Sequence, residues 1–439
     1  MSALFKSSLF STLGSLVQFA VSILSGMLIA HWLGPAGKGQ VFLVTQLASL
    51  ASLFLSMGLN TSYLYHLRKG STELKETVSH ASIVISVYAL AALGINQFGM
   101  PWLRRLTGFS LSDKMISLML VLALLNIATL LFGSILMDKP KGVQLTSMYS
   151  IGRNLLYVLL LVAVAAWFRL DTYDVILAAG LSYVVRLYLT IRSVLHGTRL
   201  KLSLHALKWT KTFLAYGLGS FAGSLMMTSV FRIDTFIVNS ISGAAQLGIY
   251  SVAVTLAEML LMFPSAIGTA LFPHLTAQAA DRRLITACFV ARLSVLVGFA
   301  SSLFMILVSY QVILIVFGRA FLPAYVPFLC LLPGLIAMTV SYGYANFFSS
   351  QGKPSMNAMI FCCGMVADVA IDLVVVPRYG ITGAAVVSTL SYLIVAGLFM
   401  LAIRRMGKVA WKDLILPNRG DILYIWNRIS VFRDRRRFD

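Results

Sequence analysis

The chain has 439 residues, of which 59% are hydrophobic and 11% are charged, and its mean hydropathy is +0.87. Soluble globular domains carry about a quarter charged residues, so this composition excludes a soluble protein and indicates an integral membrane protein. The formal net charge is +20, which requires an anionic partner such as nucleic acid or a lipid surface to be considered.

Continuous apolar runs predict about twelve membrane-spanning helices, because about 20 apolar residues in a helix cross the hydrocarbon core. In chain order these runs lie at 8–33, 41–67, 80–101, 116–137, 147–168, 174–195, 210–238, 245–275, 285–317, 325–349, 355–376 and 380–403. The connections between them are short, and no soluble domain is expected. A membrane enzyme of polysaccharide assembly normally needs a folded loop outside the membrane, so a transporter is favoured over an enzyme.

A turn between two apolar runs occurs twice. Gly34 in the first copy matches Gly243 in the second, and Gly39 matches Gly248. The two matches have the same sequence separation, which is close to half the chain. Two similar halves in an apolar chain are typical of transporters, whose substrate site lies between the repeats. We therefore expect an all-α integral membrane protein whose helices form two pseudo-symmetric six-helix bundles.

These boundaries predict four segments. Residues 1–195 form the first bundle, 196–209 a cytoplasmic linker, 210–403 the second bundle and 404–439 a basic cytoplasmic tail. With the N-terminus inside, most Lys and Arg residues fall on the cytoplasmic side, as the positive-inside rule requires. The prediction is a multi-pass protein of the cell inner membrane with both termini in the cytoplasm.

This distribution of Lys and Arg also explains the positive net charge. Basic residues at cytoplasmic helix ends and in the tail contact anionic membrane lipid, and no motif for nucleic acid accompanies them. The segment Gly34–Gly39 resembles a phosphate-binding loop only superficially, since Ser or Thr after Lys38 and a preceding strand are missing. We expect a tight turn there, and no cofactor, metal site or catalytic residue in the chain. The four cysteines lie in apolar spans and are expected to be packing residues.

Three arginines lie inside predicted spans, where a charge is costly and therefore a candidate for function. Arg186 is too deep in its span to reach water, so we expect it to face a cavity and bind substrate. Arg153 and Arg292 lie nearer their cytoplasmic ends, and either a cavity-facing role or extension of the side chain to the interface remains open.

The acidic residues inside the spans lie in the second half. Glu258 is near the middle of its span, Asp368 and Asp372 share one helix face, and Arg232 and Asp234 lie toward the outer end of theirs. Two interpretations remain open, namely a structural network of ion pairs and a site for a coupling proton or Na⁺.

Four turn motifs give the chain a family resemblance. They are Leu33–Gly39, Arg232–Asp234 followed by Leu247–Tyr250, Phe317–Phe321, and Tyr379–Ala385. With these motifs the chain resembles the Wzx-type polysaccharide flippases of the multidrug/oligosaccharidyl-lipid/polysaccharide exporter superfamily, over about residues 5–403.

The resemblance implies a V-shaped pair of bundles with alternating access. It implies a lipid-linked oligosaccharide substrate, a repeat unit on undecaprenyl pyrophosphate, with polysaccharide polymerase and chain-length proteins as partners. Members have no fixed catalytic signature, so no residue role is transferred. An ion-coupled multidrug exporter is the main alternative, although its usual carboxylate in the first helix is missing. A lipid II flippase is the second alternative, although members of that branch usually have two further spans at the C-terminus.

Overall fold

The computed structural model describes residues 3–101, 111–167, 170–196, 203–262, 280–407 and 409–415, and side chains are described from residue 17 onward and, after the gap at 263–279, from residue 283. Within these ranges the chain is helical and contains no strand. The α-helices are α1 Ala3–Ser56, α2 Leu59–Arg68, α3 Leu74–Gly94, α5 Asp113–Leu136, α6 Gly142–Trp167, α7 Thr172–Leu195, α8 Thr210–Glu258, α10 Ala280–Val312, α11 Tyr325–Ser350, α12 Pro354–Gly407 and α13 Trp411–Ile415. Short 3₁₀ or π segments adjoin them: η1 Ile95–Gly99, η2 Leu204–Trp209, η3 Met259–Leu261, η4 Ile313–Phe317 and η5 Arg319–Ala324.

Nine helical stretches among the described residues are long and apolar enough to cross a membrane. This confirms the prediction of an all-α membrane protein. Three of them, α1, α8 and α12, each consist of two helices joined at a glycine: Gly34 (φ 65°), Gly243 (φ 81°) and Gly380 (φ 57°). A side chain would strain this backbone, which is why the chain reverses direction at glycine. The two glycines of the sequence repeat therefore form equivalent turns.

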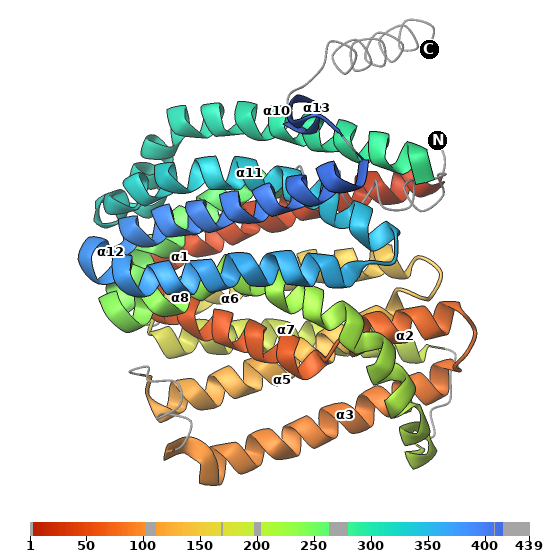
Figure 1. The fold of residues 1–439 in the computed structure, drawn as a ribbon. Helices are drawn as coiled ribbons and strands as arrows, with labels where there is room; N and C mark the ends of the chain where they lie inside the picture. The colour runs from red at the N-terminus through yellow and green to blue at the C-terminus, as the bar shows by residue number, and fades with distance from the viewer. Residues whose placement is uncertain are drawn as a thin grey trace, which may run out of the picture.

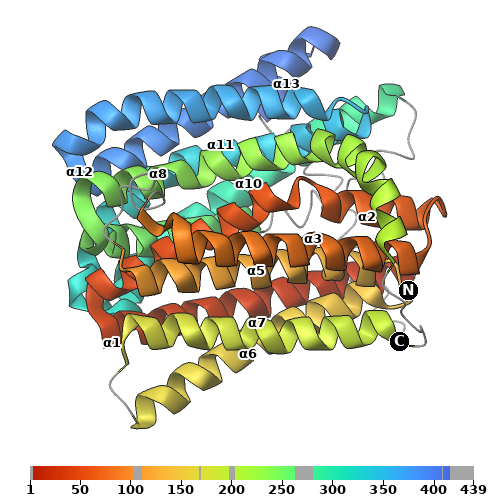
Figure 2. The same ribbon diagram turned by 90° about the horizontal axis from the view of Figure 1, so that it is seen from below.

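The helices are arranged in two groups with α1 and α8 between them (Figure 1). Helices α11 and α12 pack with α8, and α10 packs with α11, whereas α5, α6 and α7 pack with α1 and with one another. A view from below shows the same long helices side by side (Figure 2). Buried apolar side chains from both halves join in one large core cluster.

At one end of the molecule the two repeated turns pack directly on each other. A Cβ atom added to Gly39 would lie 1.8 Å from the carbonyl oxygen of Ala244, and one added to Gly248 would lie 1.9 Å from that of Pro35. Backbones approach this closely only where both residues lack a side chain. The second arm of α1 therefore crosses the second arm of α8 at the glycines that the repeat places in register.

At the opposite end α1 and α2 contact the beginning of α8. A Cβ atom on Gly58 would lie 2.1 Å from the carbonyl oxygen of Gly217, and the hydroxyls of Thr61 and Ser220 are 2.6 Å apart. The two halves therefore meet near both ends of the second arm of α1.

The segment before α8 is anchored to the first half. Lys208 Nζ lies 2.8 Å from Glu76 Oε1, and the indole nitrogen of Trp209 donates to Glu76 Oε2 at 2.7 Å. His80 accompanies this contact, with one ring nitrogen 2.7 Å from the hydroxyl of Tyr63 and the other 2.9 Å from that of Thr210. The predicted linker 196–209 thus includes a docked 3₁₀ segment, η2, while its residues 197–202 lie outside the described part of the chain.

Candidate functional site

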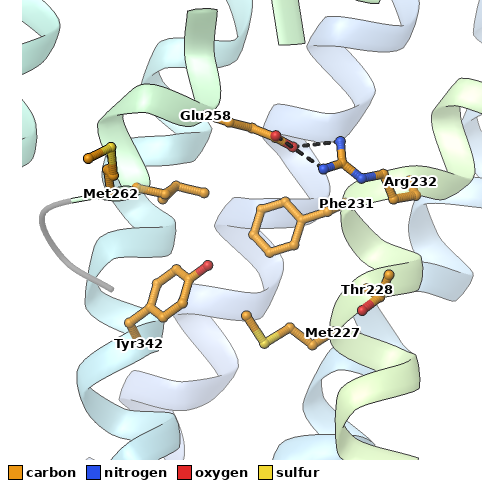
Figure 3. A pocket seen from close by; sticks show the side chains of 8 residues that line it. Met227, Thr228, Phe231, Arg232, Glu258, Met262 and Tyr342 are labelled. Atoms are coloured by element: carbon orange, nitrogen blue, oxygen red, sulfur yellow. Dashed lines mark hydrogen bonds and ion pairs between the residues drawn. The ribbon is translucent and has the colours of Figure 1, made fainter. Parts of the chain in front are cut away.

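A hollow of about 280 Å³ opens between α8 and α11 in the second half (Figure 3). An ion pair lies on its wall: Arg232 Nη1 is 2.7 Å from Glu258 Oε1, and Nη2 donates to Oε2 at 3.1 Å. Two parallel bonds of this kind fix both side chains. The other lining residues are Met227, Thr228, Phe231, Leu261, Met262 and Tyr342.

The turn at Gly243 brings these two charges together. Arg232 lies before the turn and Glu258 after it, so the two arms of α8 carry the charges to the same level. Their side chains are 22% and 31% exposed, and both therefore remain within reach of a ligand in the hollow. The sequence predicted that both residues lie in membrane spans, but it did not predict the ion pair between them.

Three carboxyl groups are buried on α8 and α12. Asp234 accepts hydrogen bonds from the hydroxyls of Tyr250 (2.6 Å) and Ser388 (3.1 Å), and Asp368 accepts one from Ser391 at 2.8 Å. Ser388 and Ser391 are three residues apart on α12, so they place the two aspartates on one face of that helix. The arms of α8 and α12 together hold this group.

Asp372 belongs to the same helix face as Asp368, as the sequence spacing predicted. It is fully buried, and neither of its carboxylate oxygens has a hydrogen-bond partner among the described residues, while Asp368 Oδ2 also lacks one. A buried carboxylate without partners is expensive when charged. The group therefore has unused capacity for a proton or a cation.

In the first half two arginines lie close together on α6 and α7. The guanidinium of Arg153 lies 4.4 Å from the ring centroid of Tyr183 and donates to Asn154 Oδ1, and its Nε is buried without a partner. Arg186 follows Tyr183 by one helical turn on α7, so its positive charge lies near that of Arg153. Neither arginine is paired with a carboxylate in the part of the chain that the structure describes. Two positive charges held together without an acid favour an anionic ligand.

Arg292 has a different environment. Its Nη1 donates to the backbone carbonyl of Asp413 at 2.6 Å, and the hydroxyl of Tyr344 donates to the carbonyl of Leu414 at 2.9 Å. Both contacts hold α13, the described part of the predicted tail, while residues 416–439 lie outside the described chain. The role of Arg292 in substrate binding stays a prediction.

Sequence reasoning missed one cation. Lys38 was expected in an outer turn, but the second helix of α1 begins directly after Gly34, so Lys38 lies within its first turns. Its Nζ lies 3.4 Å from the carbonyl oxygen of Gly26 and 5.3 Å from the ring centroid of Phe317. The signal available in the sequence was Pro35, because proline favours the first position of a helix.

The fold defines the class of protein. It is similar to that of a lipid II flippase MurJ in an inward closed conformation (12% identity, 92% of this chain and 89% of the other, TM-score 0.73). It is equally similar to that of a multidrug resistance MATE family transporter of the MOP superfamily in an inward-facing conformation (14% identity, 89% and 94%, TM-score 0.72). The chain is a multi-pass membrane protein with the fold of these transporters.

The family follows from the sequence match. The model described as "Polysaccharide biosynthesis protein" matches residues 4–279, so the chain belongs to that family. It is also 22% identical over 407 residues to a putative O-antigen transporter of Shigella flexneri, covering 88% of this chain and 94% of that protein. The family resemblance found in the turn motifs is confirmed.

Proposed function

We propose that this protein is a flippase that carries an undecaprenyl-pyrophosphate-linked oligosaccharide repeat unit across the inner membrane during cell-surface polysaccharide synthesis. The observation that carries the proposal is the pair Arg153 and Arg186, two guanidinium groups in the membrane part of the first half without a carboxylate partner. A pyrophosphate supplies the missing negative charge, and planar guanidinium groups bind phosphate oxygens in pairs. The family match and the name of the Shigella relative support the same substrate class.

The topology that we infer has twelve membrane passes. The nine apolar stretches become twelve when α1, α8 and α12 are each divided at their glycine turns. This division gives a first bundle at 1–195 and a second at 210–403, joined by 196–209. The reciprocal packing of Gly39 and Gly248 supports a two-fold relationship between the bundles. Both termini are then cytoplasmic, and polymerase and chain-length proteins are expected on the outer side.

We infer that transport proceeds by alternating access. The repeated turns close the outer end of α1 against α8, and both neighbouring folds are described as inward conformations. An outward-open state requires the contact between Gly39 and Ala244 to separate. The lipid pyrophosphate enters from the cytoplasmic side and leaves after that separation.

The carboxyl groups of the second half are the proposed coupling site. Arg232 already neutralises Glu258, whereas Asp368 and Asp372 have no cationic partner among the described residues. A proton or Na⁺ taken up by these two aspartates removes the cost of their burial. The coupling proton or Na⁺ then binds at Asp368 and Asp372, near Asp234, rather than at Glu258.

A drug exporter of the same fold is the alternative. Cationic drugs favour a cavity with acidic walls, and the membrane part of the first half presents Arg153 and Arg186 instead. Removal of the gene from its host separates the two functions. A flippase predicts loss of surface polysaccharide and accumulation of lipid-linked repeat units, with unchanged drug sensitivity. Increased sensitivity to cationic drugs with normal surface polysaccharide would establish the exporter.

A further inference from the structure

Helix α12 carries an apolar groove on its exposed surface. The helix reverses at Gly380, so its first and last turns lie side by side at the same end of the molecule (Figure 1). A groove of about 270 Å³ lies between them, lined by Met356, Met359 and Cys363 from the first arm and by Leu398, Leu401 and Arg405 from the second. Met359 is 60% exposed, so the groove opens toward the surroundings of the bundle.

The groove continues into a basic hollow at the end of α12. This hollow has a volume of about 500 Å³ and shares Leu401 and Arg405 with the groove, while Arg404 adds a second guanidinium. The guanidinium of Arg404 lies 4.8 Å from the ring centroid of Trp411, the first residue of α13. The apolar surface therefore ends at two adjacent arginines and an aromatic ring.

An apolar groove that ends at two arginines and an aromatic ring matches the chemistry of a phospholipid. Met356 and Cys363 are separated by about two helical turns, or roughly 10 Å at ~1.5 Å per residue, a depth suited to part of an acyl chain. Arginine near a cytoplasmic helix end attracts anionic headgroups, and tryptophan prefers the membrane interface. We propose that the groove and hollow bind one phospholipid with an anionic headgroup from the cytoplasmic leaflet, its phosphate at Arg404 and Arg405 and one acyl chain along Met359 and Cys363.

The site is separate from the proposed transport path. It lies on the exposed surface of α12 in the second half, whereas Arg153 and Arg186 lie on α6 and α7 of the first half. The inference therefore rests on the topology inferred above, which puts this end of α12 on the cytoplasmic side, and not on the proposed substrate. Its occupant is a resident lipid that holds the end of α12 and α13 at the membrane surface.

Native mass spectrometry of the purified full chain with phosphatidylglycerol or phosphatidylcholine tests the proposal. We expect phosphatidylglycerol to bind the wild-type chain, and the double variant Arg404→Ala/Arg405→Ala to bind it about 30-fold more weakly, since each basic residue near an anionic surface contributes about 1 kcal/mol and 1.4 kcal/mol is tenfold. Met359→Trp, which fills the groove and keeps both arginines, should also weaken binding. Arg378→Ala is the matched control, because Arg378 is an exposed arginine of α12 next to the Gly380 turn, at the end of the helical arms far from Arg404 and Arg405.

Three results would overturn the proposal. If the double variant retains as much phosphatidylglycerol as the wild type, the two arginines do not bind the headgroup. If the wild type retains as much phosphatidylcholine as phosphatidylglycerol, the site does not select an anionic headgroup. Displacement of phosphatidylglycerol by an equimolar polyprenyl phosphate would assign the groove to the transported lipid instead.

Discussion

Gly39 and Gly248 lie backbone to backbone where the two repeated turns cross. A Cβ atom on either glycine would lie within 2.8 to 3.0 Å of the amide nitrogen of the other, and still closer to the carbonyl oxygen of a neighbouring turn residue. The contact joins the two halves at the end where the chain reverses at Gly34 and Gly243. In the proposed alternating-access cycle, this contact is the gate that has to open.

Gly39→Ala should therefore favour the open outer gate. The new methyl group would overlap the carbonyl of Ala244, and overpacking costs about 1–3 kcal/mol. At 1.4 kcal/mol per tenfold, we expect the population with separated turns to rise roughly tenfold or more. The measurement is labelling of a cysteine at Leu247, which is fully buried, by a membrane-impermeant thiol reagent in a background without the native cysteines.

Gly397→Ala is the control for this experiment. A Cβ atom on Gly397 meets nothing within 4 Å, so labelling at position 247 should not change. If Gly39→Ala also leaves labelling unchanged, the contact is not the gate.

Arg186→Ala should reduce translocation of the pyrophosphate-linked substrate by about 10- to 100-fold, since a hydrogen bond to a charged group contributes about 1.5–3 kcal/mol. Arg186→Lys should retain part of the activity, because lysine keeps the charge but not the paired donors. The measurement is surface polysaccharide in cells that express each variant at the wild-type level. Arg378→Ala should remain fully active, and full polysaccharide from Arg186→Ala would contradict the binding role.

The Arg232–Glu258 pair gives a prediction about stability. Removal of one partner from a buried pair costs about 3–5 kcal/mol, and the partial exposure of both side chains lowers this to about 1–3 kcal/mol for Arg232→Met or Glu258→Gln. The double variant should lose less than the sum of the single losses. Thermal unfolding in detergent measures this coupling. Additive losses would show that the two charges do not stabilise the fold as a pair.

The variant Asp372→Asn distinguishes a role of Asp372 in ion coupling from a purely structural role. Neutralising a buried carboxylate that has no partner should leave the thermal stability unchanged or raise it. Transport should lose its dependence on the proton or Na⁺ gradient, which is measured in vesicles with an imposed gradient. Glu258→Gln should retain gradient dependence, since its carboxylate is already neutralised by Arg232. A large loss of stability in Asp372→Asn with coupling retained would make Asp372 structural.

Much of the fold follows from the sequence because the membrane limits the choices. Apolar runs long enough to cross the bilayer must be helical, since every backbone group has to be paired within the segment. The turns at Gly34 and Gly243 were identified from their repeated spacing, and Gly380 falls within the turn motif Tyr379–Ala385. Side-chain partners were less predictable. The assignment of Lys38 to a loop was wrong, because the helix resumes immediately at Pro35.

The sequence by itself determined the membrane class, the family and the uneven distribution of charge between the halves. Only the tertiary structure decided how those charges pair. Arg232 and Asp234 are two residues apart, and positions i and i+2 of a helix point in different directions. Arg232 therefore meets Glu258 across the Gly243 turn, while Asp234 turns toward Tyr250 and Ser388. Those partners lie on other helices and helical arms, and a linear pattern contains no information on which of them the packing brings together.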